Sequence, residues 1–180
     1  AECESLTFRY FVDAENAAIL LLKYAIVMED PAGHRDDEKP QFKLEILNQS
    51  GEIIDPTCGT ANFVAGKDTK AGKDGWHVNK RYATDVYWKE WTTIGLDLRD
   101  YDQQWIQIRL VTYDCLLQGH YGYAYFTLGC ANAKIFSSSC GDDPEISIEA
   151  PSGFRYQWFD NKGNEVPESR GGRSLSLKLE

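Results

Sequence analysis

The residues of this chain that could bind a metal gather in two predicted loops. Asp30 and His34 fall in one loop, and Asp114 and His120 fall in another, which joins two segments of alternating polarity. Imidazole nitrogens and carboxylate oxygens are common ligands of divalent metals, so these four residues form a candidate set if the loops meet. The alternative is that each histidine caps its own loop through hydrogen bonds. The sequence thus allows calcium or another divalent metal as a cofactor but requires none.

Aromatic residues form the second group that could bind a ligand, because aromatic rings cover the apolar faces of sugars. The candidates with polar, loop-like neighbours are Trp76, Tyr82, Tyr87 and Trp88. Tyr121, Tyr123 and Tyr125 share one face of a predicted strand, where they form either part of the core or a stacking platform. Trp91 and Trp105 are predicted to be core residues.

The segments that must position these residues alternate with a period of two, which is typical of half-buried β-strands. Ala17 to Glu29 could form a helix, but its β-branched residues favour a strand. Gly66 to Asp85 is polar and rich in glycine, which predicts a long exposed loop. We expect about eight antiparallel strands and no helix in the first 130 residues, arranged as a jelly-roll β-sandwich. Its predicted hairpins are 42–55 and 105–130.

Composition excludes several classes of function. The chain has 19 basic and 28 acidic residues, a formal net charge of −9, which makes nucleic acid an improbable partner. The longest apolar run, Ala17 to Met28, contains Lys23 and is shorter than the roughly 20 helical residues that span a bilayer. Five cysteines without metal-finger spacing fit disulfides in an oxidising compartment, so we expect a secreted or surface-exposed protein without a transmembrane segment here.

The composition changes after Cys130, which predicts a second domain. Cys140 and Trp158 are spaced like the first half of an immunoglobulin-like domain, in which that tryptophan packs on the disulfide between the sheets. The second cysteine of such a domain would lie beyond Glu180. The predicted divisions are therefore a jelly-roll sandwich over 1–131, a linker over 132–142 and a partial immunoglobulin-like domain over 143–180.

Several strings in the first 130 residues carry a resemblance to a known group of proteins. The most specific one runs from Thr112 to Tyr125, with Thr112-Tyr-Asp-Cys followed by Gly119-His-Tyr-Gly-Tyr-Ala-Tyr, and a tryptophan before Leu-Asp-Leu at 96–98 accompanies it. These resemble jelly-roll modules, of the galactose-binding or MAM-like kind, in large exported surface proteins of Bacteroidetes. The resemblance implies a location that is secreted or anchored at the outer membrane, and a role in adhesion or surface binding.

The resemblance also bears on the disulfides and on the metal candidates. Strand counting alone leaves open whether Cys3 faces Cys130 or Cys58 pairs with Cys115, and the resemblance favours Cys58–Cys115. That bond would bring His120 to the end of the sandwich that holds His34.

The leading functional hypothesis is a non-catalytic module that binds a glycan or a cell-surface protein through its end loops, beside neighbouring domains of the same chain. The main alternative is a structural spacer in an adhesin stalk. A spacer that binds no ligand should lack an exposed aromatic cluster. An enzyme, either a glycosidase with paired carboxylates or a metal hydrolase that uses the histidines, is the least favoured hypothesis because a sandwich of this size rarely has a deep cleft.

Overall fold

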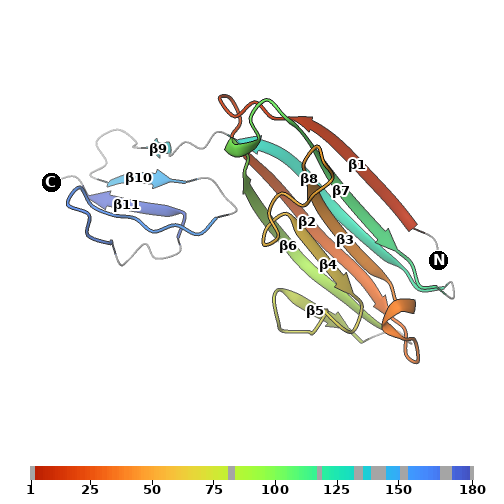
Figure 1. Ribbon diagram of the computed structural model, residues 1–180. Helices are drawn as coiled ribbons and strands as arrows, with labels where there is room; N and C mark the ends of the chain where they lie inside the picture. Colours follow the sequence, from red (N-terminus) through yellow and green to blue (C-terminus); the bar gives the residue numbers. More distant parts are fainter. Residues whose placement is uncertain are drawn as a thin grey trace.

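The computed structural model describes residues 3–80, 84–116, 119–131, 136–138, 145–150, 154–166 and 172–178. The described part of the chain is nearly all β-structure (Figure 1). The strands of its first 131 residues are β1 (Cys3–Phe11), β2 (Ile19–Asp30), β3 (Gln41–Leu47), β4 (Thr60–Val64), β5 (Trp76–Asn79), β6 (Asp85–Asp97), β7 (Trp105–Tyr113) and β8 (Gly122–Ala131). Helical structure in the described residues is confined to two 3-10 turns, Asp36–Glu38 and Arg99–Tyr101, so none of it has the length to span a bilayer.

These strands form two four-stranded sheets whose strand pairs are all antiparallel (Figure 1). The first sheet has the order β1-β7-β3-β4, and the second has the order β5-β6-β2-β8. The chain is therefore an all-β antiparallel sandwich, as its alternating pattern predicts. The expected number of strands is confirmed as well, while the finer jelly-roll arrangement stays a prediction.

The core lies between the two sheets and is built from alternate residues of each strand. In β2 the inward positions are fully buried, whereas Lys23 between them is exposed. Since successive side chains of a strand point to opposite faces, one apolar face per sheet is enough to form a continuous core. The largest buried side chains of this core are Trp76, Phe42, Leu20, Leu22, Ile26, Met28, Leu44, Ile46, Leu98, Ile106 and Ile108.

The predicted hairpins differ from the pairing in the structure. β7 and β8 follow each other but lie in different sheets, because β7 pairs with β1 and β3 while β8 pairs with β2. The segment after β3 turns back to form an isolated bridge between Ile53 and Leu47 but no strand, and the strands that flank β3 are β4 and β7. The long loop predicted over 66–85 contains β5, which adds an edge strand to β6.

The predicted disulfide between Cys58 and Cys115 is wrong. Cys3, Cys58, Cys115 and Cys130 are free thiols. The Ile46 amide donates to the Gly59 carbonyl, which places Cys58 near one end of β3. Cys115 lies at the other end, two residues after Tyr113, which pairs with Gln41. Five strand residues separate these ends by about 17 Å, and bridged cysteines need Cα atoms within about 7 Å.

The alternative pairing of Cys3 with Cys130 is not found either. Cys3 pairs in register with Tyr113, near the histidine loops, while Cys130 pairs with Leu20 at the far end of β2. The cysteines therefore give no structural support to an oxidising compartment, and the expected export rests on the resemblance. Cys140 lies outside the described residues.

A third sheet, of order β11-β10-β9, lies in the C-terminal part of the chain. Its strands are β9 (Phe136–Ser138), β10 (Glu145–Glu149) and β11 (Ser174–Lys178) (Figure 1). Trp158 donates its ring N–H to the Gly172 carbonyl over 3.0 Å, which anchors the segment before β11. The predicted division into a sandwich, a linker and an immunoglobulin-like fragment stays a prediction.

Candidate aromatic groove and histidine cluster

The outer face of the β5-β6-β2-β8 sheet carries a groove lined by aromatic side chains. Its floor is the central strand β2, which presents the small residues Ala25 and Val27 outward. Trp88 and Trp91 of β6 line one side, and Tyr125 of β8 lines the other. Their side chains are solvent-accessible, with exposed fractions of 39%, 56% and 58% respectively. We call this surface, of Ala25, Val27, Trp88, Trp91 and Tyr125, the aromatic groove.

A β-bulge explains why both tryptophans face outward. Tyr24 pairs with Thr92 and Ile26 pairs with Lys89, so two residues of β6, Glu90 and Trp91, lie opposite the single residue Ala25. The extra residue reverses the inward and outward alternation along β6. Trp88 and Trp91, which a regular strand would place on opposite faces, are therefore both exposed. This is also why the prediction that Trp91 is a core residue is wrong.

The tyrosines of β8 extend the aromatic surface. Tyr121, Tyr123 and Tyr125 are all exposed, with neighbouring ring centroids 5.7 Å apart along the strand. The exposure of these three side chains excludes a place in the core, and their use as a stacking platform stays a prediction. Val27 pairs with Trp88 on one side and with Tyr123 on the other, so the three residues form a row across the sheet.

Trp88 is held in place by a histidine of the edge strand. The His77 ring stacks on it with centroids 4.1 Å apart, and His77 Nε2 lies 2.9 Å from Glu90 Oε1. A side chain that is fixed before binding loses less conformational entropy when a ligand arrives. Trp88 is thus both accessible and ordered before any ligand arrives, and its role in ligand binding stays a prediction.

The remaining loop candidates do not share this exposure. Trp76 is 1% exposed and packs against the Phe63 ring in the core, so it is not available to a ligand at the surface. Tyr87 is half-buried against the same core, and burial together with the nearby Asp85 and Asp30 carboxylates raises its pKa. Tyr82 lies outside the described residues. Trp105, which was predicted to be core, is 43% exposed on the other sheet.

The two predicted metal-binding histidines do meet. The rings of His34 and His120 lie edge to face with centroids 5.2 Å apart, although their loops are far apart in sequence. The cause is the pairing of Gln41 with Tyr113, because β3 follows the first loop and β7 precedes the second. The Leu116 amide also donates to the Glu38 carbonyl, which joins the two loops directly.

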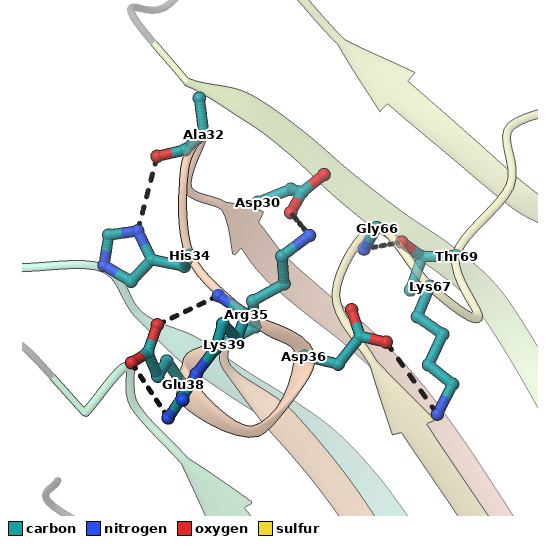
Figure 2. Close-up of polar contacts among 10 residues, drawn as sticks. All are labelled: Asp30, Ala32, His34, Arg35, Asp36, Glu38, Lys39, Gly66, Lys67 and Thr69. Atoms are coloured by element: carbon teal, nitrogen blue, oxygen red, sulfur yellow. Dashed lines mark hydrogen bonds and ion pairs between the residues drawn. The ribbon is translucent and has the colours of Figure 1, made fainter.

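The two predicted carboxylates have other partners. Asp30 Oδ1 forms an ion pair with Lys39 Nζ at 2.8 Å, and Asp114 Oδ1 accepts a hydrogen bond from the Gly122 amide at 3.0 Å. Figure 2 shows the Asp30 side chain directed toward Lys39, while His34 approaches the Ala32 carbonyl. The third side chain beside the histidines is Cys115, with its sulfur 3.3 Å from His120 Nδ1. The sequence interpretation considered Cys115 only for a disulfide.

Comparison with known proteins adds no further constraint. No protein-family model, curated protein or solved structure matches this chain. The function therefore has to be argued from the groove and the histidine cluster themselves.

Proposed function

We propose that this chain is a non-catalytic binding module of an exported surface protein, and that it holds a glycan in the aromatic groove. The observation that supports the proposal is the set of exposed aromatic side chains around the small floor residues Ala25 and Val27. A structural spacer has no need of such a set. The site differs from the end loops favoured on sequence, because the accessible aromatics lie on a sheet face.

The spacing of the strands suits a flat apolar ring. Trp91 of β6 and Tyr125 of β8 lie on either side of Ala25 in β2, so their backbones are two strands apart, about 9.6 Å. Side chains stand roughly perpendicular to a sheet, so a ring placed midway would lie about 5 Å from each aromatic wall. That separation is within the range over which stacked rings attract each other. A pyranose ring, which has apolar C–H faces and polar edges, fits this arrangement.

The charges of the groove favour binding over hydrolysis. Glu90 is the one carboxylate among the residues that line it, and it is engaged by His77. Most glycosidases need two carboxyl groups across the scissile bond, at roughly 5–10 Å. The described lining therefore supports recognition of a sugar without a means of cleaving it.

The overall charge points to a neutral glycan. The formal net charge of −9 repels acidic polysaccharides, and the one lysine of the groove, Lys89, points inward and is buried. Apolar walls without an exposed cation have no partner for a uronic acid or a sulfate. We expect neutral polysaccharides to bind and anionic ones to bind weakly.

Affinity gel electrophoresis of the whole chain on neutral and acidic soluble polysaccharides tests this proposal. We expect a neutral glycan to retard the protein, and we expect Trp91→Ala or Tyr125→Ala to weaken binding about tenfold, which corresponds to about 1.4 kcal/mol. Trp105→Ala is the matched control, because it removes an exposed tryptophan from the opposite sheet.

Retardation that is weakened equally by Trp105→Ala would contradict the role of the groove. The absence of retardation by every glycan would favour a protein ligand or the spacer function instead.

A further inference from the structure

We propose that His34, Cys115 and His120 form a zinc site at the end of the sandwich where the loop after β2 meets the loop after β7. The site lies apart from the aromatic groove and does not depend on glycan binding. His34 comes from the loop between β2 and β3, and Cys115 and His120 come from the loop between β7 and β8. All three residues belong to the described part of the chain. The metal would join the two loops through side chains.

The distances between the three side chains suit a metal ion. One ligand atom from each residue lies within 4.8 Å of the others. The bond lengths of tetrahedral zinc to sulfur and nitrogen, about 2.3 and 2.05 Å, place those two ligand atoms about 3.6 Å apart. Cys115 Sγ and His120 Nδ1 are 3.3 Å apart, so this pair already has nearly the separation that zinc requires.

The contacts of its own loop orient His34 as a metal ligand. Its Nδ1 donates to the Ala32 carbonyl at 3.4 Å (Figure 2). This bond leaves the lone pair on Nε2, and that atom is buried without a hydrogen-bond partner in the described part of the chain. Metal-bound histidines commonly donate their other ring N–H to a carbonyl in this way. A metal on Nε2 would satisfy the one polar atom of His34 that the protein leaves unpaired.

The chemistry of the three ligands selects the metal. Asp30 and Asp114 are engaged by Lys39 and by the Gly122 amide, so the available donors are two imidazoles and one thiol. Calcium and magnesium prefer oxygen ligands, whereas sulfur and imidazole together favour zinc, copper or cobalt. Of the metals that the sequence allows, the donors of this site therefore favour a transition metal over calcium.

The backbone around the cluster is already ordered for binding. The Cys115 amide donates to the His120 carbonyl at 3.0 Å, and the Leu116 amide donates to the Glu38 carbonyl at 2.9 Å. Cys115 itself is fully buried, which protects its sulfur from bulk oxidants. The three protein ligands leave one tetrahedral position for water or for an oxygen atom of a bound molecule.

Cobalt substitution of the whole reduced chain tests the proposal directly. We expect one equivalent of Co²⁺ to produce a thiolate charge-transfer band and tetrahedral d–d bands, and one equivalent of Zn²⁺ to abolish both. Cys115→Ser should remove the charge-transfer band, and His34→Ala or His120→Ala should weaken Co²⁺ affinity at least tenfold. The matched controls are Cys58→Ser and His77→Ala, which change a thiol and a histidine elsewhere and should leave the spectrum intact.

A measurement on the unaltered protein guards against variants that fail to fold. Alkylation under partly denaturing conditions, followed by peptide mapping, should show that Zn²⁺ protects Cys115 and leaves Cys58 and Cys130 unprotected. The absence of a charge-transfer band in the unaltered chain would overturn the proposal. Persistence of that band in Cys115→Ser, or equal alkylation of Cys115 with and without Zn²⁺, would overturn it as well.

Discussion

Replacement of Trp76 by alanine tests whether this residue stabilises the core or binds a ligand. The polar neighbours of Trp76 make it a candidate for sugar stacking, but the structure buries it between Phe63 and Lys89. We therefore expect Trp76→Ala to lower the free energy of unfolding strongly. At temperatures where the variant is still folded, glycan binding should change little.

The loss of unfolding free energy expected for Trp76→Ala follows from the area that the Trp76 side chain buries. An aromatic side chain of this size removes about 150–250 Å² from water, and at about 25 cal/mol per Å² this contributes about 4–6 kcal/mol. Measured truncations of buried aromatics cost about 3–5 kcal/mol. Lys89, whose ammonium lies 5.6 Å from the Trp76 ring centroid, has its pKa lowered by burial and would regain water in the variant. We expect about 3–4 kcal/mol as the net loss.

Urea denaturation followed by far-UV circular dichroism measures this loss without relying on tryptophan emission. With a urea dependence of about 2 kcal/mol per molar, the midpoint should fall by about 1.5–2 M. Trp105→Ala, at an exposed site, should lower it by less than about 0.5 M. The reasoning would be refuted if the two variants shifted the midpoint equally while Trp76→Ala alone abolished glycan binding.

Two further predictions concern the polar structure of the sandwich. Hydrogen bonds from Lys43 and, to a smaller degree, from Arg109 lower the pKa of Glu45 below its usual value of 4.5. The ionised carboxylate therefore stabilises the folded state above pH 4.5, and this contribution is lost as the pH falls through the lowered pKa of the folded state. Glu45→Gln should cost about 1 kcal/mol at pH 7, because Lys43 and Arg109 are partly exposed, and its urea midpoint should approach that of the unaltered protein as the pH falls through the lowered pKa of Glu45. Gly66→Ala should lower the melting temperature by several degrees, because the φ of Gly66 is +72° and an added Cβ would clash with the Asp30 carboxylate. Gly33→Ala, which has a similar φ and an open surrounding, measures the backbone strain alone, and an equal effect of both variants would show that the contact with Asp30 is unimportant.

The strands could be predicted from the sequence, but their partners could not. The segment 42–47 matches β3 closely, because one buried face imposes a period of two on each strand. Pairing depends on contacts between distant segments, which no local pattern records. The turn after β3 therefore suggested a hairpin with Ile53, whereas β3 is bordered by β4 and β7.

The histidine cluster was predicted for an incorrect reason. His34 and His120 were expected to meet through a Cys58–Cys115 bond. They meet instead because the first loop leads into β3 at Gln41 and the second loop leaves β7 at Tyr113, and these two residues are paired. The same pairing brings Cys115 into the cluster. Sequence spacing alone could not indicate this, because Cys115 looks like any cysteine at the end of a strand.

The β-bulge in β6 links the fold to the proposed binding surface. Without the extra residue opposite Ala25, Trp91 would point into the core, and only Trp88 would remain on that side of the groove. An exposed tryptophan beside an exposed tyrosine adds nothing to the buried core, and large apolar patches on soluble proteins usually mark interaction sites. The bulge thus moves an aromatic residue from a place where it would stabilise the fold to a place where it can contact a ligand. A binding role for this face accounts for that arrangement, whereas a spacer role leaves it without a purpose.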